Sequence, residues 1–180
     1  MMSKTDVIII GAGQAGLAVS HCLTCLGIDH LVLERGQVAE RWRNERWDTL
    51  RLLTPNWMNR MPGHSYNGAD PDGFMTAAEY AAFLQNYADS GAVPVRAQTE
   101  VQSVQRLGGG YRIATRNGIW HARGVVIATG HCDEPFVPAM AQRLPAAIQQ
   151  VTTSTYRRAA DLPQGGVLII GASASGIQLA

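Results

Sequence analysis

Three glycines near the N-terminus have a spacing that is typical of nucleotide binding. Gly11, Gly13 and Gly16 have the spacing Gly-x-Gly-x-x-Gly and directly follow an apolar run at residues 7–10. In a turn of this kind the first glycine permits the tight bend, the second lets the backbone approach a pyrophosphate, and the third lets the following helix pack closely on the strand. The N-terminus of that helix offers unpaired N–H groups and a positive dipole to phosphates. The spacing therefore predicts a dinucleotide-binding turn.

An acidic residue supports this prediction. Glu34 stands at the end of the next apolar run, residues 30–33. Its carboxylate can accept hydrogen bonds from ribose hydroxyls and would repel a 2′-phosphate, so the first site suits FAD or NAD rather than NADP. Arg35 could be interpreted as a 2′-phosphate ligand, but an arginine there can also stack on adenine or face water, and we favour the latter interpretation.

The same pattern recurs near the end of the chain. Residues 167–176 repeat residues 7–16 in register and without a gap, with Ser173 at the middle glycine position. A side chain there would crowd a pyrophosphate, although its hydroxyl could donate to a phosphate oxygen. We expect a nicotinamide dinucleotide site here, with a purely structural strand–turn–helix as the alternative. Its residues would be Gly171, Ser173, Ala174, Ser175 and Gly176.

The elements that must hold these turns indicate an α/β class with a Rossmann-like fold. Continuous apolar runs without polar alternation are typical of parallel strands buried on both faces. Such runs occur at residues 7–10, 30–33, 125–128 and 167–170. Apolar residues at helical spacing predict a helix over residues 17–26 between the first two strands, which completes a βαβ unit.

The middle of the chain predicts three further features. Residues 36–74 are rich in Arg, Trp, Asn, Pro and Gly and predict an irregular excursion with one short helix near residues 38–46. Thr76 and Glu79 have the spacing of a capping box, which predicts a helix to about residue 90. Three strand-like segments then predict an antiparallel β-meander inserted in the parallel domain, with a hairpin at the Asn-Gly pair 117–118. They lie at residues 100–106, 111–115 and 119–122.

Composition excludes several classes of function. The 180 residues carry a net charge of +1 from interspersed charges, so a nucleic-acid partner is not expected. The first apolar run is too short for a signal peptide or a membrane span, and we interpret the protein as cytoplasmic. Cys22 and Cys25 form a Cys-x-x-Cys inside the first predicted helix, where we expect the thiols to pack as small apolar groups rather than act as a redox pair. No histidine has metal-ligand spacing, so no metal site is expected.

The ordered set of motifs resembles the flavin-containing monooxygenase superfamily over the whole chain. The set comprises the first glycine turn with Leu-Glu-Arg, residues 39–42 (Ala-Glu-Arg-Trp), residues 47–52 (Trp-Asp-Thr-Leu-Arg-Leu), residues 125–130 (Val-Val-Ile-Ala-Thr-Gly) and the second turn. It is most similar to bacterial NAD(P)/FAD-dependent oxidoreductases of that superfamily. The fold implied is a two-dinucleotide-binding flavoprotein, with an FAD-binding domain at residues 1–150 and the start of an NAD(P)-binding domain at residues 151–180, which would be incomplete.

The resemblance also implies roles for particular residues. Gly11, Gly13, Gln14, Ala15 and Gly16 would wrap the FAD pyrophosphate, and Glu34 would hold the ribose. The remaining FAD-binding positions would be Arg41 and Trp42 near the ribityl and isoalloxazine portion, Leu52 and Thr54 in the same cleft, Val101 through its backbone at the adenine, and Thr129 and Gly130 closing over the cofactor. For Trp42, packing under the loop is an equally good interpretation.

The activity implied is that of a flavin monooxygenase. NADPH or NADH would reduce FAD, and a C4a-(hydro)peroxyflavin would oxygenate a small organic substrate with dioxygen. Because the cofactor carries the chemistry, no catalytic side chain is assigned. Two alternatives stay open: a flavin disulfide or quinone reductase, and a truncated FAD-binding fragment without activity. A homo-oligomer is compatible with each.

Overall fold

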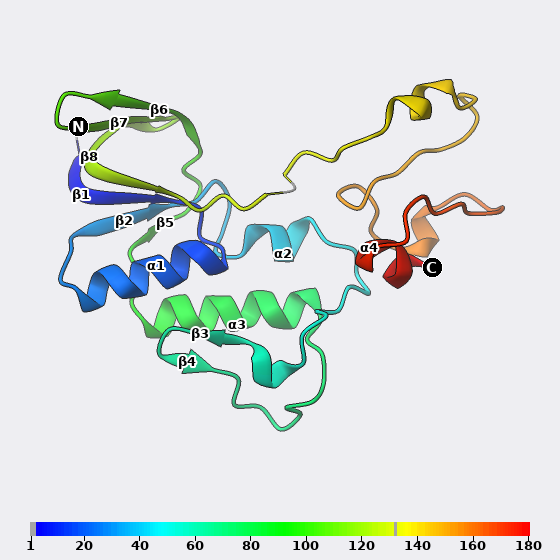
Figure 1. Cartoon of the computed structure of the whole chain (residues 1–180), viewed down its shortest axis with the longest axis horizontal. Coiled ribbons are helices and arrows are strands. Elements are labelled where there is room, and N and C mark those ends of the chain that lie inside the picture. The colour runs from blue at the N-terminus through cyan, green and yellow to red at the C-terminus, as the bar shows by residue number, and fades with distance from the viewer. Residues whose placement is uncertain (1–2, 132) are drawn as a thin grey trace.

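The computed structural model describes residues 3–131 and 133–180. A six-stranded sheet in the order β5-β2-β1-β8-β7-β6 lies at one end of the molecule (Figure 1). In the parallel half, β1 (Ser3–Ile10) lies between β2 (His30–Leu33) and β8 (Gly118–Ile127), and β5 (Val95–Arg96) extends the sheet beyond β2. The α/β fold class predicted from the sequence is confirmed. β5, which the apolar pattern did not predict, is only two residues long.

Burial on both faces explains the continuous apolar runs at residues 7–10 of β1 and residues 31–33 of β2. Ile8 and Ile9 point to opposite faces of the sheet, and both are 0% exposed. Helices α1 (Gln14–Cys25) and α3 (Ala77–Ser90) lie on one side of the parallel strands, and β6 and β7 lie toward the other (Figure 1). The main core, which includes Ile9, Leu17 and Leu84, fills the space between these helices and the sheet.

Helix α3 begins and ends where its sequence predicts. Thr76 is the N-cap, and its side chain accepts from the amide of Glu79 while the Glu79 carboxylate accepts from the amide of Thr76. Gly91 is the C-cap. The face that packs on the core carries Tyr80, Ala81, Leu84, Tyr87 and Ala88. The helix therefore provides a fixed support below α1 and α2.

The antiparallel meander is confirmed, with one correction. β6 (Val101–Leu107) pairs with β7 (Gly110–Thr115), and β7 pairs with β8. The segments predicted as two strands, residues 119–122 and 125–128, form the single strand β8. Pairing with β1 along its whole length, from Ser3↔Trp120 to Ile10↔Ile127, keeps β8 extended across Gly124. The meander therefore continues the parallel sheet.

The predicted irregular excursion contains short elements only. α2 (Glu40–Asn44) falls inside the range predicted for a short helix, and a 3-10 helix (Asn56–Met58) and the hairpin β3 (Arg60–Met61) and β4 (His64–Ser65) follow it. An isolated bridge between Arg51 and Thr76 closes the base of this excursion at the start of α3.

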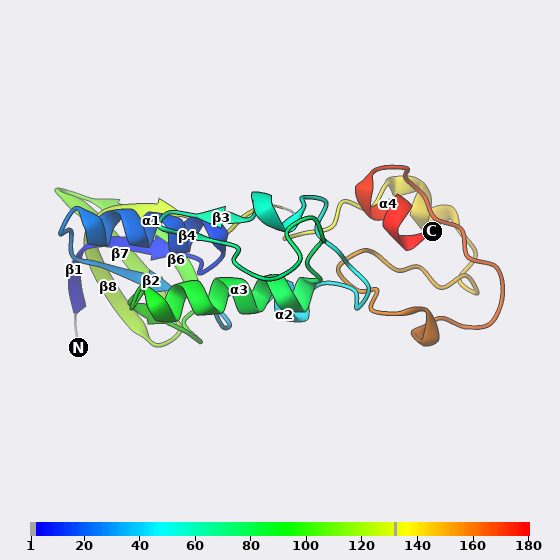
Figure 2. The ribbon, with the colours of Figure 1, turned by 90° about the horizontal axis from the view of Figure 1, so that it is seen from below.

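Residues 134–180, here called the arm, extend away from the sheet (Figure 2). The arm has two short 3-10 helices (Ala139–Arg143 and Ala159–Asp161) and ends in α4 (Ala174–Leu179). The strand predicted over residues 167–170 is wrong: these residues form no strand, and Leu168 is 84% exposed. A parallel strand is stabilised by its neighbours, and no described strand lies beside this run. No described helix is long and apolar enough to cross a membrane.

The arm docks on the excursion through few contacts. The Gln178 side chain donates to the carbonyl of Arg51 at 3.0 Å and accepts from its amide at 3.3 Å. Leu179 and Tyr156 pack against the buried cluster of Trp47, Leu50 and Ala77. These contacts place α4 beside the part of the excursion that follows α2.

Candidate dinucleotide-binding site

Contacts around the first turn explain two of its three glycines. Gly11 has φ +106°, and a Cβ there would lie 2.6 Å from the carbonyl oxygen of Ala128. A Cβ on Gly16 would overlap the carbonyl oxygen of Gly11. Gly13 differs from both, because a Cβ there would meet no heavy atom within 4 Å. The bend and the close packing use Gly11 and Gly16, and the space at Gly13 is open to a ligand.

That open space lies at the N-terminus of α1. Gly13 is the N-cap residue, and no side chain caps the helix. The first backbone amide that bonds within the helix is that of Leu17, which donates to the Gly13 carbonyl at 3.0 Å. The amides of Gln14, Ala15 and Gly16 precede it, as required for holding an anion. The turn therefore fits a dinucleotide pyrophosphate.

Glu34 is fixed beside this turn by two backbone amides. Its side chain is 7% exposed, and its two carboxylate oxygens accept from the amides of Ala12 at 2.7 Å and Gly36 at 2.9 Å. The carbonyl of Ala12 in turn accepts from the amide of Ala39 at 3.0 Å. A carboxylate has about four acceptor positions, so two remain for ribose hydroxyls. Glu34 therefore fits its predicted role and also holds the peptide of the turn.

Arg35 lies in a cluster of four charged side chains. Its guanidinium binds Asp133 at 2.8 and 3.1 Å and Glu45 at 2.7 Å, and Glu45 also binds Arg41 at 3.0 Å. The hydrogen bond to Asp133 raises the pKa of Arg35, and the same bond holds the pKa of Asp133 below its ordinary value. Stacking of Arg35 on adenine and contact with a 2′-phosphate stay predictions, and the structure pairs its guanidinium with two carboxylates.

Two residues of this cluster, Glu45 and Asp133, were not singled out from the sequence. Arg35 and Asp133 are 98 positions apart, and no local motif connects them. The backbone carbonyl of His131 accepts from Arg41 at 2.9 Å, so the cluster also ties the segment after β8 to α2. Its position next to Glu34 makes it part of the site.

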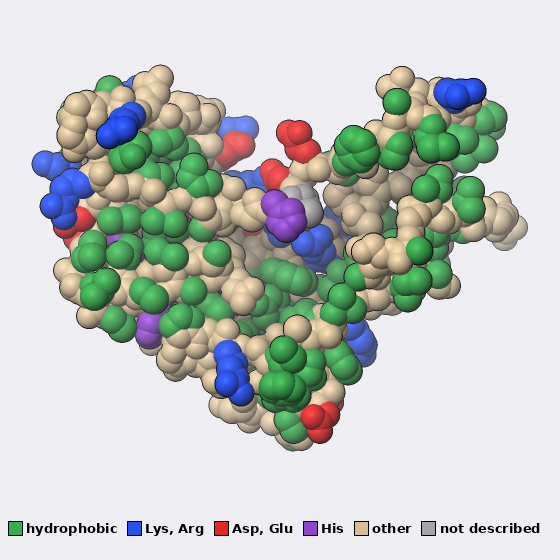
Figure 3. Space-filling view, in the orientation of Figure 1, with side chains coloured by type: hydrophobic (Ala, Val, Ile, Leu, Met, Phe, Trp, Pro, Cys, Tyr) green, Lys and Arg blue, Asp and Glu red, His purple; other side chains and the backbone are tan. Residues whose placement is uncertain are grey.

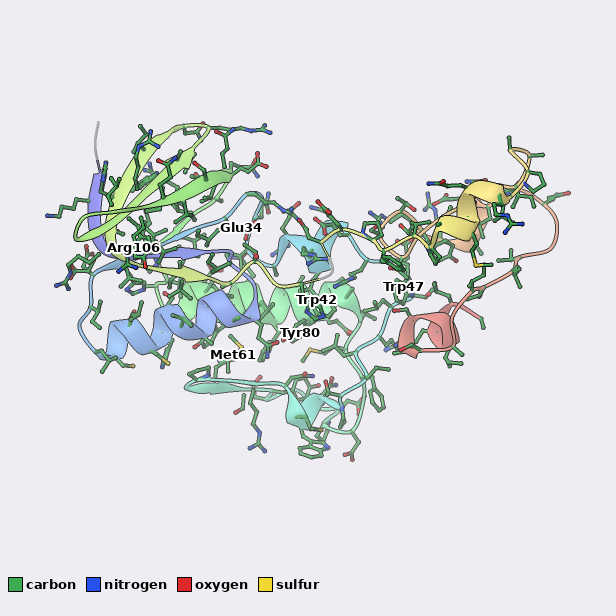
Figure 4. All side chains as sticks on the ribbon, turned by 45° about the horizontal axis from the view of Figure 1, so that its top comes forward. Glu34, Trp42, Trp47, Met61, Tyr80 and Arg106 are labelled. Atoms are coloured by element: carbon green, nitrogen blue, oxygen red, sulfur yellow. The ribbon has the colours of Figure 1, made fainter. Side chains whose placement is uncertain are left out.

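α2 carries Trp42, which was predicted to lie near the flavin. The indole packs edge-to-face with Tyr80 at 4.9 Å between ring centroids, and the Arg46 guanidinium lies 5.2 Å from its ring centre. Trp42 and Tyr80 are adjacent between α2 and α3 in Figure 4, with Glu34 toward the sheet. Burial raises the pKa of Tyr80 to about 12, so its hydroxyl stays protonated at neutral pH. The packing role of Trp42 is present, and the flavin role stays a prediction.

The remaining predicted residues lie on separate elements. Leu52 is half-buried against the main core, Thr54 is exposed and donates to the Asn59 side chain at 3.2 Å, and Val101 is the first residue of β6. Thr129 and Gly130 follow β8, and a Cβ on Gly130 would lie 3.6 Å from Arg41. The segment after β8 therefore runs from Gly11 toward α2. Figure 3 shows the surface hollowed between the sheet body and the arm.

The second turn has the backbone of the first. Gly171 has φ +117°, Ser173 is the N-cap with φ −85° and ψ −178°, and Gly13 has −85° and −172°. The carbonyl of Ser173 accepts from Ile177 at 3.0 Å, as that of Gly13 does from Leu17. A Cβ on Gly176 would overlap the Gly171 carbonyl oxygen, as at the first turn. The repeat thus extends from sequence to backbone conformation, although the strand before it is absent.

The expectation that the Cys22 and Cys25 thiols pack against the protein is wrong. Both are free and exposed on the C-terminal half of α1. The shared helical face of residues three apart points to solvent here, because α1 turns Leu17 and Ser20 toward the sheet. Among the described residues, no group of three or more His, Cys, Asp or Glu side chains could hold a metal ion.

Comparison with known proteins adds a family and relatives. Residues 8–180 match the profile of the family described as pyridine nucleotide-disulphide oxidoreductase. The chain is 38% identical over 181 residues to the uncharacterized oxidoreductase CzcO-like of Geobacillus kaustophilus, covering 100% of this chain and 51% of that protein.

Two solved structures share the fold. The flavin-containing monooxygenase from Stenotrophomonas maltophilia has a TM-score of 0.68 and 31% identity, over 76% of this chain and 42% of that one. Bacillithiol disulfide reductase Bdr from Bacillus cereus has a TM-score of 0.68 and 27% identity, over 77% and 44%. The chain thus spans about half the length of the relatives it matches. The resemblance stated from the sequence is confirmed.

Proposed function

The chain belongs to the pyridine nucleotide-disulphide oxidoreductase family, and on that premise we propose that its first turn binds FAD and its second turn binds NADPH or NADH in an oxidoreductase. The observation that carries the proposal is the open cradle at Gly13 with Glu34 fixed beside it. The amides at the start of α1 suit the pyrophosphate, and the carboxylate of Glu34 suits a ribose. We also propose the division into an FAD-binding domain at residues 1–150 and an NAD(P)-binding portion from residue 151.

The roles of the chain's own residues follow from this geometry. The amides of Gln14, Ala15 and Gly16 bind the pyrophosphate, and the carboxylate of Glu34 accepts from the ribose hydroxyls. Glu34 keeps the peptide of Ala12 in place before the nucleotide arrives, so the cradle is formed in advance. When bound, the flavin would supply the redox chemistry, accepting hydride from the nicotinamide and reacting with dioxygen.

Within this function, a monooxygenase acting on a small organic substrate with dioxygen is our first choice. It is supported by the 31% identity to a flavin-containing monooxygenase structure and by the ordered motifs of the chain. Trp42 and Tyr80 pack edge-to-face between α2 and α3, and we propose that their ring surfaces face the flavin. The free thiols of Cys22 and Cys25 support a reducing, cytoplasmic location.

A flavin disulfide reductase is the second candidate, because a bacillithiol disulfide reductase shares the fold. The only described free thiols, Cys22 and Cys25, lie toward the end of α1 opposite the turn. Nine residues of helix separate Gly13 from Cys22, about 13 Å along the axis, which is too far for direct exchange with a flavin held at the turn. The double variant Cys22→Ser/Cys25→Ser should therefore bind FAD unchanged. An altered spectrum of bound FAD in this variant would favour the reductase.

Identification of the bound nucleotide tests the proposal. The purified chain is incubated with a mixture of FAD, FMN and NADP, desalted and denatured, and the released nucleotides are separated by chromatography. We expect FAD at a stoichiometry approaching one. Release of FMN, or of NADP alone, would contradict the assignment of the first turn.

A further inference from the structure

Arg35 is the positively charged residue nearest in sequence to Glu34, which is the predicted partner of the ribose. It follows Glu34 directly, at the position from which an arginine can reach a ribose 2′-phosphate. In the structure its guanidinium binds two carboxylates instead, those of Asp133 and Glu45. We propose that Glu45 and Asp133 determine the nucleotide specificity of the first turn, by holding Arg35 so that it cannot pair with a 2′-phosphate. This inference rests on the proposed function, since it takes the first turn as the nucleotide site.

Three of the five N–H groups of the Arg35 guanidinium already donate hydrogen bonds to Glu45 and Asp133. Both N–H groups of Nη2 are used, one to Oε1 of Glu45 at 2.7 Å and one to Oδ1 of Asp133 at 2.8 Å. One N–H group of Nη1 donates to Oδ2 of Asp133 at 3.1 Å, so the contact with Asp133 is bidentate. Bidentate pairing fixes the plane of a guanidinium as well as its position. The same edge cannot face a phosphate at the same time.

Charge at the site acts in the same direction. Glu34, Glu45 and Asp133 supply three carboxylates, and Arg35 and Arg41 supply two guanidinium groups. The five groups together carry one net negative charge. A 2′-phosphate would bring about two more negative charges to them, whereas a ribose hydroxyl brings none. Removing the charges of Glu45 and Asp133 would change the net charge of these five groups from negative to positive.

Glu45 is suited to this role because it contacts both arginines. Its Oε1 binds Arg35 and its Oε2 binds Arg41 at 3.0 Å. Arg41 is further fixed by the backbone carbonyl of His131 at 2.9 Å, so it does not depend on Glu45 alone. The hydrogen bonds of the Arg35 guanidinium go to Glu45 and Asp133. The neutral variants Glu45→Gln and Asp133→Asn should therefore release Arg35 more than Arg41.

The experiment compares two ligands that carry the same number of phosphates, so that specificity for a 2′-phosphate is distinguished from a general attraction of phosphates. 5′-ADP and 2′,5′-ADP each carry two phosphates, and only the second has one on the ribose 2′ oxygen. Dissociation constants for both, and for FAD, are measured by calorimetric titration of the chain and of the double variant D133N/E45Q. Both substitutions keep side-chain size, and Asp133 is 51% exposed, so we expect folding to be retained. Thermal unfolding of each variant checks this.

We expect D133N/E45Q to gain about threefold to thirtyfold in affinity for 2′,5′-ADP relative to 5′-ADP, the range for a partly exposed guanidinium–phosphate pair. The triple variant D133N/E45Q/R35A should lose this gain. The matched control is D161N, which removes the acid of another Arg–Asp pair, Arg158–Asp161, in which Asp161 is 46% exposed. D161N should leave the affinity ratio unchanged.

Three results would overturn the inference. The ratio could be unchanged in D133N/E45Q, the gain could survive R35A, or D161N could produce the same gain. An unchanged ratio would show that Glu45 and Asp133 do not determine specificity. A gain that survives R35A would come from the negative charge of the two acids and not from Arg35. The same gain in D161N would show a general charge effect. A failure of the proposed function looks different, because the wild-type chain would then bind neither FAD nor 5′-ADP.

Discussion

Gly13→Ala separates the folding of the first turn from its proposed binding role. Gly13 has φ −85° and ψ −172°, a conformation open to any residue, and an added Cβ meets no heavy atom within 4 Å. The folded chain should therefore accept the substitution without strain. Alanine narrows the unfolded ensemble, which stabilises by about 0.4–1 kcal/mol, but it is a poorer N-cap than glycine by a similar amount. We therefore expect the free energy of unfolding to change by less than about 1 kcal/mol.

The same methyl group would occupy the space into which the pyrophosphate must come. Holding the phosphate away from the amides of Gln14 and Ala15 weakens two charge-assisted hydrogen bonds, and we expect a loss of about 2–3 kcal/mol, or roughly thirtyfold to over a hundredfold in the dissociation constant of FAD. FAD affinity should thus fall while stability stays nearly unchanged. General damage to the fold would lower both.

Gly108→Ala is the matched control for this experiment. Gly108 lies in the turn between β6 and β7, and a Cβ there also meets no heavy atom within 4 Å. FAD binding is followed by the change in flavin fluorescence, and stability by denaturant unfolding. We expect Gly108→Ala to bind FAD as the wild type does. Equal affinity in both variants, or unfolding of Gly13→Ala, would refute the reasoning.

Three other substitutions test neighbouring parts of the account. Glu34→Gln turns one acceptor into an NH₂ group facing a backbone amide, so FAD affinity and the free energy of unfolding should each fall by about 1–3 kcal/mol; an unchanged dissociation constant would remove Glu34 from the site. Ala39 has φ +61°, so Ala39→Gly should raise the free energy of unfolding by about 0.5–1 kcal/mol in denaturant titration, and a decrease would deny strain there. Thr76→Ala removes the N-cap of α3 and should cost about 1 kcal/mol at neutral pH. Hydrogen bonds from Thr76 hold the pKa of Glu79 below its ordinary value of 4.5, so this stabilisation is present above that pH and is lost as pH falls through the lower folded pKa. The difference between wild type and Thr76→Ala should therefore shrink in acid, and a difference that grows would contradict the assignment.

Local signals in the sequence were sufficient where one residue acts on its near neighbours. The range of β2, the cap at Thr76 and the end of α3 at Gly91 are confirmed because apolar runs, capping boxes and glycine C-caps act within a few residues. The glycine turn was predictable for the same reason. Gly11 and Gly16 each meet a backbone carbonyl within these six residues, and the space at Gly13 stays open.

Features that depend on distant partners were not predictable. Asp133 joins the site only because β8 returns beside β1 and delivers the following segment to α2. β8 crosses Gly124 because β1 pairs with it on both sides of that residue. Residues 167–170 have the apolar composition of a strand but no described strand to pair with. Composition supplies the tendency to form a strand, and neighbours in the sheet decide whether it forms.

The central claim is that the first turn binds the pyrophosphate of FAD and that Glu34 binds its ribose. The most direct test is a crystal structure of the chain soaked or co-crystallised with FAD. We predict phosphate oxygens within hydrogen-bond distance of the amides of Gln14 and Ala15, and a ribose hydroxyl donating to the carboxylate of Glu34, with the bonds from Ala12 and Gly36 retained. FAD bound away from Gly13, or a ribose that does not contact Glu34, would contradict the account.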